Sequence, residues 1–115
     1  MKIIDRKALL IVPPTGLYNR EERNQALVSK LAVSALRPPL DLCQIAAVLQ
    51  KRGIECRIAD FPAERLVWAD LETLIKDFRP DTLIISSTTF TLSLDLKSCS
   101  LAKGIDPQIT TITKG

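Results

Sequence analysis

The sequence has 115 residues, of which 46% are hydrophobic and 25% are charged, and its formal net charge is +3. This length suits a single domain, and the balance of apolar and charged residues is that of a folded globular protein rather than a disordered chain. Basic and acidic residues are interleaved, as over residues 19–23, whereas proteins that bind nucleic acid usually cluster their basic residues. We therefore expect one domain over residues 1–115 that does not bind nucleic acid.

The chain contains three cysteines, Cys43, Cys56 and Cys99. Their wide spacing fits neither a metal-binding nor a redox motif, and each lies beside apolar residues, so we expect free thiols in a reducing compartment. Charged residues lie too close to the apolar run over residues 8–12 for a signal peptide, and this run is too short for a membrane span. We expect a cytoplasmic protein that does not contact a membrane.

The first predicted element is a strand. A continuous apolar run over residues 7–12 is stopped by Pro13 and Pro14, which predicts a buried central strand. Residues 17–38 are ambiguous. Within them, residues 25–36 are compatible with a helix, but their apolar residues are spread too evenly for one clear stripe, and a partly ordered loop is the alternative.

In the middle of the chain, the sequence pattern predicts a helix, a strand and a second helix in this order. A helix begins at Leu40, because apolar residues recur every three or four positions on one face, and Gly53 supplies a left-handed end. Residues 54–58 then alternate between apolar and polar, as in an edge strand with one wetter face. A second helix is predicted over residues 69–78. Its inner face is expected to carry Leu71, Leu74, Ile75 and Phe78.

The last third of the chain predicts two further strands around a helix. Residues 82–86 form another buried apolar run, residues 109–113 form the last strand, and a helix spans residues 93–103 between them. The residues expected to face inward near this helix are Leu92, Leu96 and Cys99.

Strands that alternate with helices imply right-handed crossovers and a parallel sheet that is covered on both faces. We predict an α/β fold with an open, flavodoxin-like (Rossmann-type) parallel sheet in the strand order 2-1-3-4. Doubly wound sheets of this type have five strands, whereas four strands are predicted here. We therefore expect the domain to be incomplete at its C-terminus.

A ligand of such a sheet is expected at the carboxyl ends of the strands, in the crevice between the first and third strands. Neither of the common glycine-rich phosphate-binding motifs is present. The hydroxyl groups after the third strand suit a polar, weakly charged ligand, but the alternative is that they only cap the next helix. The candidate binding residues are Pro13, Pro14, Thr15, Gly16, Ser87, Thr88, Thr89, Phe90 and Gly115.

Acid–base chemistry has little support in the sequence. There is no histidine, which removes the commonest general base and the commonest metal ligand. Asp60 follows a strand and could bind a ligand or accept a phosphoryl group, although an isolated Asp at such a place is more often a turn former. We expect no catalytic residue and no protein metal ligand, and we expect that the chain does not catalyse a reaction on its own.

Six short segments together resemble a known family. They are residues 9–14, 37–42, 45–49, 53–56, Asp60 and residues 79–81. Their order and spacing resemble the N-terminal cobalamin-binding domain of cobalamin-dependent radical S-adenosylmethionine enzymes, a group that includes methyltransferases and the anaerobic magnesium-protoporphyrin ester cyclases. The resemblance covers essentially the whole chain. It implies a flavodoxin-like domain that holds cobalamin over its strand ends.

Two loops of this family have counterparts in the sequence. The S-x-L-type loop falls at residues 87–89, with Thr89 in place of leucine, and the G-G pair falls at Lys114 and Gly115. The D-x-H-x-x-G motif is absent, so the resemblance implies cobalamin bound without a histidine ligand from the protein. The C-x-x-x-C-x-x-C motif is also absent, so the resemblance implies a radical-domain partner, or a C-terminal region outside this chain, that carries the iron–sulfur cluster.

The sequence supports two hypotheses from different classes. The first is a cobalamin-binding module, or part of one, that holds the cofactor for a partner catalytic domain. The second is a non-catalytic α/β interaction domain that no longer binds cofactor. Such a domain would self-associate as a homodimer through the exposed last strand at residues 109–113.

Overall fold

Four parallel strands form the centre of the protein in the computed structural model, which describes residues 6–14, 18–21, 24–27, 39–89 and 91–114. The strands lie in the order β4-β1-β5-β6. Their bounds are β1 Lys7–Val12, β4 Glu55–Asp60, β5 Thr82–Ser86 and β6 Thr110–Lys114. This is the predicted order 2-1-3-4, so the α/β class and the flavodoxin-like topology are confirmed.

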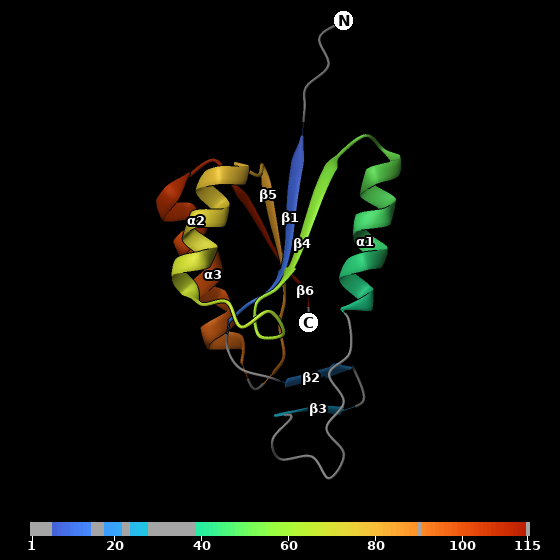
Figure 1. Ribbon diagram of the computed structural model, residues 1–115, viewed down its shortest axis with the longest axis vertical. Helices are drawn as coiled ribbons and strands as arrows, with labels where there is room; N and C mark the ends of the chain where they lie inside the picture. The colour runs from blue at the N-terminus through green and yellow to red at the C-terminus, as the bar shows by residue number, and fades with distance from the viewer. Residues whose placement is uncertain (1–5, 15–17, 22–23, 28–38, 90, 115) are drawn as a thin grey trace, which may run out of the picture.

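Within the described part of the chain, three helices cover the two faces of this sheet unequally. They are α1 Leu40–Lys51, α2 Trp68–Phe78 and α3 Leu92–Ile105. Figure 1 shows α1 alone on one face, with α2 and α3 together on the other. No helix among the described residues is long and apolar enough to cross a lipid bilayer.

The alternation of side chains along β1 builds a core on each face of the sheet. Leu9 and Ile11 pack in a cluster with residues of α2, while Leu10 packs with Leu42 and Ala46 of α1. Each of these five side chains is at most 4% exposed. A parallel strand that is buried on both faces requires a continuous apolar run, which is the pattern that predicted this strand.

Individual residues define the C-terminus of α1 and the N-terminus of α2. Gly53, just after α1, has a φ of 82°, a left-handed conformation that glycine adopts without strain. At the start of α2, the backbone N–H of Val67 donates to Asp70 Oδ2 at 2.7 Å. The inner face of α2 is as predicted, since Leu71 and Ile75 are fully buried.

A two-stranded antiparallel sheet corrects the prediction for part of residues 17–38. β2 Tyr18–Glu21 pairs with β3 Asn24–Leu27, so the possible helix over residues 25–36 is wrong for residues 25–27. Two short segments that are separated by two residues can pair locally, whereas an isolated helix must first form a costly nucleus. Residues 28–36 lie outside the described residues. Figure 1 places β2 and β3 beyond the carboxyl ends of the parallel strands.

The orientation of α3 also differs from the prediction. Leu92 and Leu96 were expected to face inward, but they are 44% and 43% exposed. Cys99, which was also expected to face inward, is half-buried and packs against the core. The buried face of α3 carries instead Asp95, Ser98 and Ala102. This orientation is set by polar contacts, because Asp95 accepts hydrogen bonds from the turn that precedes the helix. Apolar spacing alone does not detect an interaction of this kind.

Candidate binding site at the carboxyl edge of the sheet

The parallel strands all end at one edge of the sheet, and the chain leaves two neighbouring strands there in opposite directions. The next helix after β1 is α1, on one face, whereas β5 is followed by α3 on the other face. In open α/β sheets the ligand crevice lies at such a switch point. The structure therefore confirms that β1 and β5, the first and third strands of the sheet in chain order, are adjacent.

The two prolines after β1 have different roles. Pro13 is fully buried and belongs to the core, while Pro14 is half-buried and reaches the surface of the edge. The carbonyl of Val12 accepts a hydrogen bond from the Phe61 N–H at 3.1 Å, which joins the ends of β1 and β4. Pro14 is therefore the member of this predicted pair that a ligand can contact.

The residues after β5 are tied to the end of β6. The Ser87 backbone N–H donates to the Lys114 carbonyl at 2.8 Å, and the Ser87 hydroxyl donates to the same oxygen at 3.3 Å. Ser87 and Thr88 are buried, whereas Thr89 is exposed. Of these three predicted residues, Thr89 presents its side chain to the surface.

A buried hydrogen-bond network holds the turn after β5 against the start of α3. Asp95 is fully buried, and its Oδ2 accepts from the Thr88 N–H at 3.3 Å and from the Thr91 hydroxyl at 2.5 Å. The hydroxyls of Thr88 and Thr91 lie 2.8 Å apart. The position of Asp95 in the first turn of α3 also places its negative charge near the positive end of the helix dipole. These contacts support the interpretation that the hydroxyl cluster stabilises the start of α3.

The segment after β4 folds into a compact turn around Asp60. The Asp60 carboxylate accepts from the Ala63 N–H at 3.2 Å, and the Asp60 N–H donates to Glu64 Oε2 at 2.9 Å. These contacts are those of a turn former, which was one of the two roles considered for Asp60. The turn holds Arg65 at a φ of 57°, a left-handed conformation that is uncommon for a residue with a side chain.

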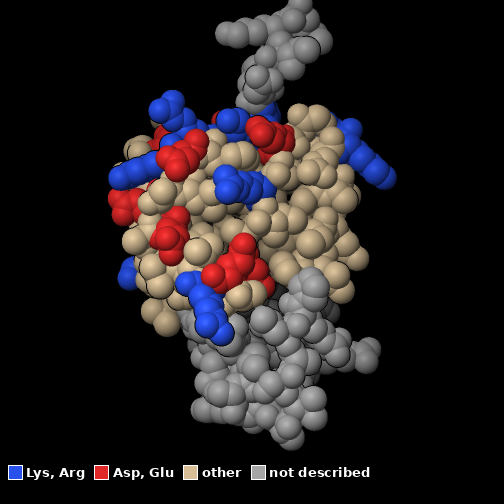
Figure 2. All heavy atoms as spheres, viewed as in Figure 1, with Lys and Arg blue, Asp and Glu red and all other residues tan. Residues whose placement is uncertain are grey.

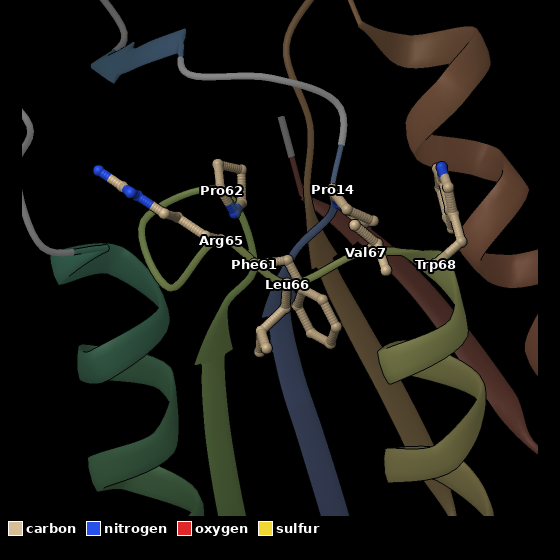
Figure 3. Close-up of a pocket in the computed structure, with 7 residues that line it drawn as sticks. All are labelled: Pro14, Phe61, Pro62, Arg65, Leu66, Val67 and Trp68. Atoms are coloured by element: carbon tan, nitrogen blue, oxygen red, sulfur yellow. The ribbon is translucent and has the colours of Figure 1, made fainter.

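Beside this turn lies an open pocket with a volume of about 280 Å³. It is lined by Pro14, Phe61, Pro62, Arg65, Leu66, Val67 and Trp68. Figure 3 shows Phe61, Leu66 and Val67 close to Pro14, with Trp68 to one side, while the Arg65 side chain extends away from them. The Lys97 ammonium lies 4.8 Å from the centre of the Trp68 ring, a cation–π contact that holds the indole at the rim.

An ion pair crosses the same edge on the other face of the sheet. The Lys114 ammonium binds Asp41 Oδ2, so the last residue of β6 is joined to the first turn of α1. Both side chains are about one-third exposed. The charge of each group is thus balanced within the protein.

Some of the predicted site residues lie together at the carboxyl edge, and further residues that were not predicted lie beside them. Pro14, Ser87, Thr88 and Thr89 lie at the carboxyl edge, whereas Thr15, Gly16, Phe90 and Gly115 lie outside the described residues. Sequence reasoning missed the pocket residues that follow β4, although their place directly after a strand was a usable signal. It also missed the ion pair, because nothing in the sequence links Asp41 to Lys114.

Two comparisons with known proteins identify relatives of the chain. The sequence profile of the B12 binding domain family matches residues 30–115. The chain is also 30% identical over 115 residues to an uncharacterized methyltransferase of Pyrococcus horikoshii. That alignment covers 100% of this chain but 22% of the relative. No solved structure shows significant similarity to the chain.

Proposed function

Since the chain belongs to the B12-binding domain family, we propose that it holds cobalamin at the carboxyl edge of its sheet for a methyltransferase domain that it does not contain. The observation that carries this proposal is the match over residues 30–115, together with the switch point between β1 and β5 at that edge. The candidate contacts among the described residues are Pro14, Ser87, Thr88, Thr89 and Arg65.

The chemistry of the edge fits such a cofactor. The rim of a corrin carries amide groups, and the nucleotide tail carries one phosphate, so the ligand is large, polar and weakly charged. The buried carboxylate of Asp95 is engaged by Thr88 and Thr91, and the charges of Asp41 and Lys114 neutralise each other. The Arg65 guanidinium adds donors that suit an amide carbonyl or a phosphate oxygen.

The protein groups at this edge have binding and positioning roles. Bound cobalamin supplies a cobalt centre that carries the methyl group in methyl transfer. Asp95 holds the turn of residues 87–89 in place through the Thr88 N–H and the Thr91 hydroxyl. The open pocket beside Pro14 offers a mostly apolar surface next to the strand ends. Because the sequence contains no histidine, this chain offers no imidazole to cobalt.

We further propose that the catalytic partner is a radical S-adenosylmethionine domain. Support comes from the resemblance of the sequence and from the relative, which is named a methyltransferase and of which this chain spans 22%. A C-x-x-x-C-x-x-C motif, absent from these 115 residues, is expected in the same reading frame or in a neighbouring gene. The genomic sequence around this chain tests the proposal, and a locus without such a motif would count against it.

Gel filtration with hydroxocobalamin tests the binding proposal. We expect the red cofactor to co-elute with the protein. Thr89→Trp places a bulky ring at the proposed site and should abolish co-elution, whereas Thr73→Trp, at an exposed position of α2, should not. The proposal is wrong if the wild-type protein elutes without colour, or if Thr89→Trp retains the cofactor as well as the wild type does.

A further inference from the structure

β4 is an outer strand of the parallel sheet. It is the second strand of the flavodoxin-like order 2-1-3-4-5, which lies at the edge whether the sheet has four strands or five. Proteins commonly block exposed edge strands with charged side chains, and β4 carries Glu55 and Arg57, both exposed. Because these two charges are opposite in sign, they suit a strand that presents the same two charges in the reverse order.

Hydrogen bonds at the ends of β4 show which of its backbone groups face outward. The N–H groups of Glu55 and Phe61 donate to backbone carbonyls at the two ends of β1, at 3.0 and 3.1 Å. Backbone groups alternate in direction along a strand, so residues 55, 57 and 59 point toward β1. The N–H and C=O groups of Cys56 and Ile58 consequently point to the edge, where none of the described strands pairs with them.

The two charged side chains of β4 lie on the face of the sheet that α2 covers. Ala59 packs in the core cluster of that face, and residues two positions apart in a strand share a face. Glu55 and Arg57 therefore point to the same side as Ala59. Neither of them forms an ion pair with another of the described residues, so both charges are available to a partner.

The other face of the sheet presents an uncharged surface beside β4. Ile58 is 37% exposed, although its neighbour in the register, Leu10, is fully buried. The flank of α1 on this side is opposite the one that carries Asp41, which points to β6. Cys43 and Gln50 lie half a turn around the helix from Asp41, and both are exposed. In Figure 2 the surface over α1 is uncharged except near one end of the helix.

We propose that two copies of this chain pair through β4 in antiparallel fashion about a two-fold axis beside Cys56, which joins their sheets into one continuous sheet. Cys56 then lies opposite the partner's Cys56, and the two residues exchange two hydrogen bonds. The Ile58 N–H donates to the carbonyl of the partner's Ile54. Between these positions, Glu55 lies opposite the partner's Arg57 as a non-hydrogen-bonded pair, in which side chains approach most closely. The symmetry gives two such ion pairs.

Two neighbouring registers are less favourable than this one. An axis beside Arg57 would bring Arg57 opposite the partner's Arg57, and like charges directly opposite are destabilising. An axis beside Ile58 would require the outward groups of Asp60, which are already bound. The Asp60 N–H donates to Glu64 Oε2 at 2.9 Å, and the Asp60 carbonyl accepts from the Glu64 N–H at 2.9 Å. The charges and the unpaired backbone groups thus agree on the axis beside Cys56.

A second copy is the occupant that β4 suits because the charges of this strand are complementary to themselves. A two-fold interface requires one surface to fit its own copy, and here each acidic side chain at position 55 meets a basic one at position 57. The antiparallel arrangement also places the two carboxyl edges at opposite ends of the joined sheet. Pairing through β4 is therefore independent of cobalamin binding, and either proposal can fail alone.

Sedimentation equilibrium of the 115-residue chain tests the pairing. We expect the mass to rise with concentration from 12.7 kDa toward twice that value. Arg57→Glu turns both ion pairs into contacts between like charges and should weaken dimerisation by about tenfold or more. The matched control is Lys103→Glu, which makes the same change of charge at an exposed position of α3 and should leave dimerisation unchanged.

Two further measurements address the register. Glu55→Arg alone should also weaken dimerisation, but an equimolar mixture of Glu55→Arg and Arg57→Glu should form a heterodimer, because every pair between positions 55 and 57 then joins opposite charges. In hydrogen exchange, the amides of Cys56 and Ile58 should become protected as concentration rises, whereas the Glu55 amide, already bonded toward β1, should not change. A wild-type protein that stays monomeric at millimolar concentration would overturn the proposal. Equal dimerisation of Arg57→Glu and the wild type, or a mixture that stays monomeric, would also overturn it.

Discussion

Asp41 and Lys114 are 73 positions apart in the sequence, yet they form an ion pair that joins the start of α1 to the end of β6. The pair closes one side of the carboxyl edge and orients the flank of α1 toward the last strand. It thus lies beside the proposed cofactor site.

Breaking this ion pair should have a small effect on stability. Both side chains are about one-third exposed, and pairs in contact with solvent typically contribute about 0.2–1 kcal/mol. We expect Asp41→Asn and Lys114→Gln each to lower the free energy of unfolding by no more than about 1 kcal/mol. Urea denaturation of both single variants and the double variant measures the coupling, which should fall as salt is raised. A coupling near zero at low salt would show that the pair does not stabilise the fold.

Removal of the Asp95 carboxylate should cost more. Asp95 is fully buried and accepts hydrogen bonds from the Thr88 N–H and the Thr91 hydroxyl. Asp95→Ala leaves these donors without their acceptor, so we expect a loss of about 1–3 kcal/mol. The control Asp77→Ala, at an exposed position of α2, should change stability by less than about 0.5 kcal/mol. Similar losses for the two variants in thermal unfolding would contradict the role given to Asp95.

In contrast, removal of the Ser98 hydroxyl should not destabilise the protein. Its Oγ is buried and has no hydrogen-bond partner among the described residues, so burial of this hydroxyl is uncompensated. Ser98→Ala should therefore leave the free energy of unfolding unchanged or raise it by up to about 1 kcal/mol. Ser100→Ala, at an exposed position of the same helix, is the matched control. A clear destabilisation specific to Ser98→Ala would mean that the hydroxyl forms a stabilising contact.

The cysteines should differ in reactivity. Burial raises the pKa of the Cys56 thiol above its ordinary value, whereas Cys43 is exposed. Because the thiolate is the reactive form, iodoacetamide at mildly alkaline pH should label Cys43 before Cys56, as mass spectrometry of digests would reveal. The folded state also retains the Cys56 proton at a pH at which the unfolded state loses it. Stability should thus decline as pH rises through the alkaline thiol range, and this decline should be smaller in Cys56→Ala.

Much of the fold could be predicted because its signals are local. The run from Ala8 to Val12 is apolar at every position, and this pattern alone identifies a strand buried on both faces. The orientation of α3 could not be obtained in this way, since Asp95 enters the interior through hydrogen bonds with Thr88 and Thr91. Leucine spacing therefore predicted the wrong face for Leu92 and Leu96.

The candidate site was predictable to the extent that its place follows from the topology of the sheet. The place of Pro14 and Thr89 depends only on which strands are adjacent, and the order 2-1-3-4 is the one expected for a flavodoxin-like sheet. The pocket around Phe61 and Trp68 depends instead on how the turn after Asp60 folds back. The contact of Asp41 with Lys114 depends on the tilt of α1 over the sheet, which no local sequence pattern specifies.

Nuclear magnetic resonance mapping with hydroxocobalamin tests the central claim most directly. In ¹⁵N-labelled protein, we predict saturable shifts of the amides of Thr88, Thr89 and Lys114 at the carboxyl edge of the sheet. The amides of Gly53 and Gly104, which lie toward the opposite ends of the strands, should not move. Shifts confined to Gly53 and Gly104, or a spectrum that hydroxocobalamin leaves unchanged, would contradict a cobalamin site at the carboxyl edge.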